Sequence, residues 1–140
     1  MKRLLVLFLA IVMLTATVIP AFAAVPEDNV VSPQYAYIKS CKASLSINED
    51  TGVATCNSYC YAASGYTVKI QCKLQQYTGS TWSTLKTWSV SGPYYANVNE
   101  NWTVTGGFTY RVYCLFSIYN SAGALVETGT TTNSYVFPKK

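Results

Sequence analysis

The stretch that decides the fold reads Val68-Lys69-Ile70-Gln71-Cys72-Lys73-Leu74-Gln75. Every second side chain is apolar, and the side chains between them are polar or charged. This period of two places the two kinds on opposite faces of an extended chain. A strand with one buried face and one wetted face is typical of an antiparallel sheet that packs on a core. The stretch therefore predicts a half-buried β-strand.

The same alternation continues on the N-terminal side. One parity holds Cys41, Ala43, Leu45 and Ile47, and after the turn-forming run from Asn48 to Gly52 another holds Ala54, Cys56, Cys60 and Ala62. Gly52 can adopt the left-handed backbone that such a turn requires. The region therefore predicts a β-hairpin whose apolar side chains share one face.

Further strands are predicted on the C-terminal side. They cover Thr81 to Val90, the region around Val98 to Val104, Tyr110 to Ile118, and Leu125 to Thr131. In the first of these, Trp82, Leu85 and Trp88 cannot share one face without a bulge, which predicts an irregular edge strand. About seven short strands separated by turns, with no helical period after the N-terminal segment, indicate an all-β fold, an antiparallel β-sandwich.

The N-terminus has the pattern of a secretory signal peptide. A short basic start at Lys2 and Arg3 precedes an apolar run from Leu4 to Ile19, and small residues end the segment at Ala23. The sequence therefore predicts a cleaved signal peptide over 1–23, a flexible arm over 24–34 and a single β-sandwich domain over 35–140. The mature chain is expected to be secreted and extracellular, with no stable membrane anchor.

Composition argues against several classes of function. The chain has 140 residues, with 10 Lys+Arg, 6 Asp+Glu and no His. Removal of Lys2 and Arg3 leaves 8 basic side chains against 6 acidic ones, which gives no electrostatic footprint for nucleic acid. The absence of histidine removes every His-based triad and every His metal ligand. From the charge balance we expect no nucleic-acid partner, and from the missing histidine we expect no His-based catalytic or metal site.

The carboxylates and cysteines also lack a catalytic or metal-binding pattern. Glu100 and Glu127 are dispersed in the sequence, whereas a glycosidase holds two carboxyls about 5 to 10 Å apart. Cys56 and Cys60 have a close spacing, but no histidine and no second close pair accompany them. The expectation is a protein that is not an enzyme and has no metal and no cofactor.

All five cysteines follow the predicted signal peptide, and in an oxidising compartment such residues pair. If Asn48 and Val53 close the first turn, Cys41 lies directly opposite Cys60. Their Cβ atoms would then be about 4.5 to 5.5 Å apart, close to what a disulfide needs. We predict this bridge, worth roughly 3 kcal/mol for a loop of about 20 residues. Because five is odd, at least one thiol is left over or pairs between molecules.

Several motifs resemble those of a known group of proteins. They are Leu74-Gln75-Gln76-Tyr77-Thr78-Gly79-Ser80-Thr81-Trp82, Lys86-Thr87-Trp88, Gly107-Phe108-Thr109-Tyr110-Arg111-Val112 and Tyr119-Asn120-Ser121-Ala122-Gly123. The chain resembles small secreted, functionally uncharacterised proteins of Gram-positive, clostridia-type bacteria over most of its mature length. The resemblance implies a bacterial exported protein with a compact immunoglobulin-like sandwich. It transfers no active site.

An immunoglobulin-like order offers two partners for Cys114. Cys56 would face Cys114 across the core, whereas Cys72 would lie beside Cys114 in the same sheet. The alternation allows both, so a second bridge from Cys114 to Cys56 and one from Cys114 to Cys72 both stay open.

The same order places the strand of Lys69 beside the strand of Arg111. An outward row is then expected from Lys69, Gln71, Lys73, Arg111, Tyr113 and Tyr119. Flat rings beside amides and ammonium groups form a platform for an extracellular glycan or protein partner. The sequence thus predicts a secreted, non-enzymatic binding or interaction module with an unknown ligand. The alternative is a secreted antagonistic effector or toxin that acts on an envelope or membrane. No oligomeric state is predicted.

Overall fold

A computed structural model describes residues 34–140 of the chain. The predicted signal peptide and nearly all of the predicted arm lie outside the described residues. Seven strands follow one another in the described part. Their bounds are β1 Ile38–Asn48, β2 Val53–Ala62, β3 Thr67–Tyr77, β4 Trp82–Pro93, β5 Tyr95–Thr103, β6 Phe108–Tyr119 and β7 Leu125–Phe137.

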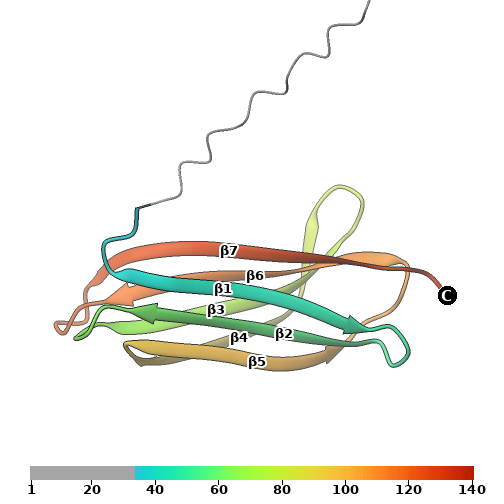
Figure 1. Cartoon of the computed structure of the whole chain (residues 1–140). Helices are drawn as coiled ribbons and strands as arrows, with labels where there is room; N and C mark the ends of the chain where they lie inside the picture. Colours follow the sequence, from blue (N-terminus) through green and yellow to red (C-terminus); the bar gives the residue numbers. More distant parts are fainter. Residues whose placement is uncertain (1–33) are drawn as a thin grey trace, which may run out of the picture. The chain divides into compact units, whose positions relative to one another are not determined.

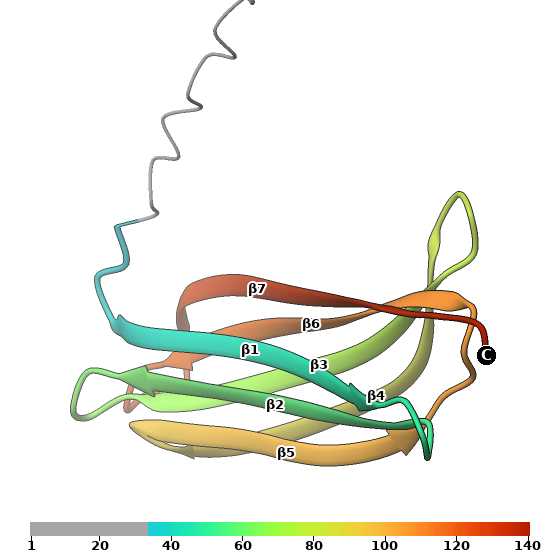
Figure 2. The same ribbon diagram turned by 45° about the vertical axis from the view of Figure 1, so that its right-hand side comes forward.

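The strands form two antiparallel sheets that lie on each other (Figure 1). One sheet has three strands in the order β1-β2-β5, and the other has four in the order β4-β3-β6-β7. At one lateral edge β1 packs against β7, and at the other β5 packs against β4, so the two layers stay in contact along both sides (Figure 2). The prediction of an all-β fold with about seven antiparallel strands is confirmed.

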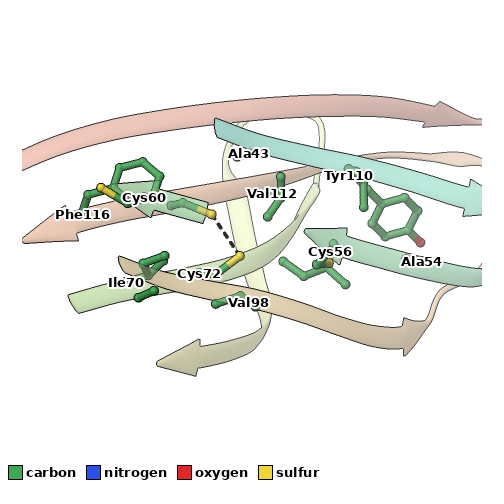
Figure 3. Packing of buried hydrophobic residues seen from close by; sticks show 14 of the residues in the cluster. Ala43, Ala54, Cys56, Cys60, Ile70, Cys72, Val98, Tyr110, Val112 and Phe116 are labelled. Carbon is green, nitrogen blue, oxygen red and sulfur yellow. Dashed lines mark hydrogen bonds between the residues drawn. The ribbon is translucent and has the colours of Figure 1, made fainter. Parts of the chain in front are cut away.

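The core lies between the layers and is formed by alternate residues of every strand. In β3 the side chains of Val68, Ile70, Cys72 and Leu74 are completely buried, as the alternation in this strand predicts. Residues of both sheets, such as Val98 of β5 and Phe116 of β6, point into the same space (Figure 3). Burying apolar surface contributes about 25 cal/mol per Å², so this shared interior stabilises the pairing of the sheets.

The first hairpin has the predicted register. Ile47 pairs with Ala54, Leu45 with Cys56 and Cys41 with Cys60. Gly52 closes the turn with a φ of 70°, and its N–H donates to the carbonyl of Asn48 over 2.8 Å. A one-residue slip would move every apolar side chain to solvent, so burial of one face determines this register.

Strand β4 is an edge strand with the predicted irregularity. Its register to β3 shifts between Leu74 and Gln75, which pair with Lys86 and Thr84 and leave Leu85 as the extra residue. The bulge reverses the alternation. Trp88 therefore lies opposite the buried Cys72, whereas Trp82 at the start of β4 pairs with Tyr77 at the end of β3.

Two predicted strand ends are wrong. β4 continues through Ser91 and Gly92 to Pro93, and only Tyr94 separates it from β5, because those residues still pair with β3. β7 continues beyond Thr131 to Phe137, since it pairs with β6 along its whole length and buries Phe137 at its end. Partner strands, rather than local turn-forming residues, determine both ends.

Candidate functional site

The six side chains of the predicted ligand-binding row lie on one face of the four-stranded sheet. Strands β3 and β6 are neighbours, so the predicted adjacency is confirmed. Lys73 pairs with Tyr113, Gln71 with Leu115 and Lys69 with Ser117, all outward from the core. Tyr119 ends the row opposite Thr67. We call the outward surface of Lys69, Gln71, Lys73, Arg111, Tyr113 and Tyr119 the cationic face.

Arg111 is held in place at one end of the cationic face. Its Nε donates to Oε1 of Gln75 over 2.8 Å, and Gln75 in turn donates from Nε2 to the hydroxyl of Thr84 over 3.0 Å. The guanidinium carbon lies 4.2 Å from the ring centroid of Trp82 and 5.7 Å from that of Tyr113. A cation over an aromatic face is attracted by the ring quadrupole. Arg111 therefore forms part of an ordered cluster.

Trp82 belongs to this cluster but not to the binding row predicted from the sequence. The signal was present in the spacing of Trp82, Leu85 and Trp88, because a bulge between the two tryptophans places them on opposite faces. The ring of Trp82 also lies 5.2 Å from that of Tyr77. Trp82 and Tyr77 therefore extend the predicted row with a pair of aromatic rings beside the β3–β4 loop.

The charge on this face has one sign. Among described residues, the outward positions of β4, β3, β6 and β7 hold Lys69, Lys73 and Arg111 and no carboxylate. The described acids lie elsewhere. They are Glu49 and Asp50 in the β1–β2 turn, Glu100 on β5, and Glu127 on β7 opposite the inward Ile118. The face therefore favours ligands with negative charge.

Glu127 has a structural role, because backbone N–H groups at the start of β1 and just before it bind its carboxylate. Its two carboxylate oxygens accept hydrogen bonds from the backbone N–H groups of Ala36, Tyr37 and Ile38 over 2.7, 2.9 and 2.6 Å. Burial opposes the charged form, but these N–H groups and the nearby Lys39 outweigh it and hold the pKa of Glu127 below its usual value. The carboxylate ties the segment before β1 to β7.

The structure does not bring Glu100 and Glu127 together. Glu100 lies on β5, which packs beside β4, and Glu127 lies on β7, which packs beside β1 at the other lateral edge. A hollow of about 280 Å³ along residues 125–128 includes Glu127 but no second carboxylate. The pair of acids that glycoside hydrolysis requires is therefore not assembled by these two residues.

Four of the five cysteines form two close pairs of thiols. The sulfur atoms of Cys41 and Cys60 are 2.6 Å apart across β1 and β2, and those of Cys72 and Cys114 are 3.0 Å apart across β3 and β6. The dashed line in Figure 3 reaches Cys72. All five are free thiols in the structure. Of the two partners left open for Cys114, Cys72 is the one directly opposite.

Cys56 is the thiol without a directly opposed cysteine. It pairs across the strands with Leu45 and Glu100. Burial, with a smaller contribution from Cys114, raises the pKa of Cys56 to about 12. A thiol with so high a pKa is a poor nucleophile, because the thiolate is the reactive form. Cys56 thus lacks the activation that a catalytic cysteine needs.

The described residues hold no group of three or more His, Cys, Asp or Glu side chains arranged to bind a metal ion. Within residues 34–140, no helix has the length and apolar character that crossing a membrane would require.

Comparisons with protein-family models, with curated proteins and with solved structures gave no match to this chain.

Proposed function

We propose that this protein is an exported, non-enzymatic binding module that holds an anionic extracellular ligand, a glycan or a protein, on the cationic face. The single observation that carries the proposal is the outward row of Lys69, Lys73 and Arg111 among aromatic rings, with no described carboxylate on that side of the sheet. The alternation of β3 and β6 places all three cations on the solvent side.

We propose that the sandwich is of the immunoglobulin-like type, and two features of the fold support this. Sheets of three and four strands are typical of that architecture, although here β4 pairs with β3 rather than with β5. The buried Tyr110 near the start of β6 donates from its hydroxyl to the carbonyl of Thr105 over 2.7 Å. A tyrosine that bonds back to the chain just upstream is a hallmark of the corner before the penultimate strand, although Tyr110 lies four residues before Cys114 rather than the usual two.

Aromatic and cationic groups would share the binding energy. An exposed ion pair contributes only about 0.2 to 1 kcal/mol and is screened by salt, so three cations alone would bind weakly. The rings of Trp82, Tyr113 and Tyr119 add flat contact area beside the charges. The combination fits an acidic sugar chain or an acidic protein surface.

The test is a binding screen with acidic glycans and extracellular proteins, followed by variants. We expect the double variant Tyr113→Ala/Tyr119→Ala to lose binding, and Lys73→Ala to weaken it by about threefold or more. Lys42→Ala is the matched control, because Lys42 lies opposite Tyr59 on the other sheet. Affinity should fall as ionic strength rises. Unchanged binding in the double tyrosine variant would exclude this face.

An experiment with anionic liposomes that hold a trapped dye distinguishes the alternative function from passive binding. A passive binder leaves a trapped dye inside the vesicles. Release of the dye would instead support a secreted antagonistic effector that acts on a membrane.

A further inference from the structure

The other outer face, on the three-stranded sheet, has a different chemistry. Of the residues that regular strand pairing places outward there, only Lys42 is charged. The remainder are tyrosines, asparagines, serines, threonines and one valine. We call the part formed by Tyr59, Tyr61, Tyr95, Asn57, Asn97 and Asn99 the tyrosine face.

Three rings form a connected row on the tyrosine face. Tyr61 of β2 pairs with Tyr95 of β5, and their ring centroids lie 4.4 Å apart with planes inclined by 32°. Tyr59 adjoins Tyr61 at 5.8 Å, with its ring turned edge-on. Tyr61 keeps 44% of its surface exposed. The row thus presents aromatic surface to solvent although it lies on a hydrophilic sheet.

Side-chain amides lie next to this row. Asn97 pairs with Tyr59, and Asn99 pairs with Asn57 one step further along the same two strands. An amide both donates and accepts hydrogen bonds, and so does a tyrosine hydroxyl. The face therefore offers rings for stacking and uncharged donors and acceptors within a few residues.

The chain segment that supplies Tyr95 is strained. Tyr94 is the non-glycine residue with a left-handed backbone in the described part, with a φ of 49°, and its side chain is 59% exposed. Its N–H donates to the carbonyl of Tyr66, and its carbonyl accepts from the N–H of Ala62, each over 2.8 Å. A non-glycine residue keeps this conformation only where the surrounding structure holds it there, and such residues cluster at functional sites. Here the one-residue corner brings Tyr95 opposite Tyr61.

We propose that the tyrosine face binds a neutral glycan chain. The face of a sugar ring that carries C–H groups stacks on an aromatic ring. The hydroxyls of the sugar donate hydrogen bonds to side-chain amides and accept hydrogen bonds from them. An anionic ligand would find only one ammonium group there, which argues against phosphate-rich, sulfated or carboxylated chains. A flat, uncharged, ring-and-amide surface complements a ligand that is itself uncharged. This site lies on the other sheet from the cationic face and does not depend on it.

The proposal is tested with an array of defined oligosaccharides that contains neutral and acidic members, probed with the chain that follows the predicted signal peptide. We expect at least one neutral glycan to bind. Its affinity should be unchanged between 0.05 and about 1 M NaCl, because screening acts only on charges. Binding on the cationic face should fall over the same range, which distinguishes the two sites.

Variants then locate the site. We expect Tyr61→Ala and Tyr95→Ala each to weaken the neutral glycan by about tenfold or more, whereas Tyr61→Phe keeps the ring and stays within about threefold. Phe108→Ala is the matched control and should bind normally, because Phe108 is an exposed aromatic residue at the start of β6 that belongs to neither face. Far-ultraviolet dichroism and thermal melting of each variant confirm that the fold is retained.

Three outcomes would overturn the proposal. The first is an array in which no neutral glycan binds. The second is equal binding by the parent chain and by Tyr61→Ala. The third is a sedimentation experiment in which Tyr61→Ala turns an associated species into monomers, because the face would then be covered by a second copy of the chain.

Discussion

At the scale of single residues, the thiol pairs depend on which strands are neighbours. Cys72 and Cys114 are buried to the same degree as Cys56, so burial alone does not distinguish the three. What distinguishes them is that β3 and β6 run side by side with Cys72 opposite Cys114. Cβ atoms of such opposed residues lie within reach of a disulfide.

We therefore expect oxidation by a small disulfide, such as oxidised glutathione, to join Cys41 to Cys60 and Cys72 to Cys114. Each bridge transfers two electrons and two protons to the oxidant, so the chain loses two hydrogen atoms per bridge. Alkylation of the unfolded, unreduced protein should then label Cys56 alone, as read by peptide mapping. A peptide that links Cys56 to Cys114 would contradict this pairing.

Glu127 is the second residue whose role the structure makes testable. Its pKa is lowered in the folded state, so its contribution to stability is present above the unfolded pKa of about 4.3 and is lost as pH falls through the folded value. We expect Glu127→Gln to destabilise the protein at pH 7 and to have much less effect at pH 3. Urea unfolding at the two pH values measures this difference.

The same variant should loosen the segment before β1. The amides of Ala36, Tyr37 and Ile38 lose a charged acceptor, so their hydrogen exchange at pH 7 should become faster. Glu100→Gln is the control, and it should leave these amides unchanged. Equal exchange in Glu127→Gln and the parent chain would contradict the anchoring role.

At the scale of elements, the β1–β2 turn is joined to the connection between β5 and β6. The N–H of Val104 donates to the carbonyl of Gly52 over 2.8 Å. A Cβ atom added at Gly52 would lie 2.6 Å from the carbonyl oxygen of Val104, which is closer than real contacts allow. Gly52 is therefore required both for its positive φ and for this close approach.

We expect Gly52→Ala to destabilise the protein more than Gly123→Ala does. Both positions have a positive φ, of 70° and 78°, which costs an L-residue about 1 to 2 kcal/mol. Apart from its own chain neighbours, Gly123 has no atom within 4 Å of the added Cβ, so only Gly52→Ala also disturbs a neighbouring strand connection. A difference of about 1 kcal/mol or more in the free energy of unfolding is expected, and equal losses would contradict the argument.

At the scale of the whole molecule, the two predicted bridges would stabilise different layers. Cys41–Cys60 joins strands of the three-stranded sheet, and Cys72–Cys114 joins strands of the four-stranded sheet. For loops of these lengths the expected contributions are roughly 3 and 4 kcal/mol. Their sum is comparable with the total stability of a small domain, which is about 5 to 15 kcal/mol.

Full reduction should therefore lower the melting temperature by roughly 20 to 30 °C. Melting curves by dichroism, with and without a phosphine reductant, measure the shift. The double variant Cys41→Ser/Cys60→Ser lacks only the bridge with the smaller contribution, so its melting temperature should fall by less than half of this shift. A melting temperature that does not change after mass spectrometry has shown complete reduction would contradict the prediction.

Much of the fold was readable from local pattern. The alternation in Val68 to Gln75 gave the correct buried set, and the first turn gave the register that places Cys41 opposite Cys60. The neighbours β3 and β6, expected from the resemblance, also agree with the structure. The side of Trp82 and the length of β7 could not be read in this way, because one depends on a bulge in β4 and the other on pairing with β6.

Taken by itself, the sequence determined which face of β1, β2, β3 and β6 is buried, since a half-buried strand repeats every two residues and this period is a local property. Only the tertiary structure decided which strands lie side by side, and with that the partner of Cys114, the anchoring of residues 36–38 by Glu127, and the meeting of Tyr61 with Tyr95. Such contacts join residues tens of positions apart, and the packing of both sheets on one core selects them.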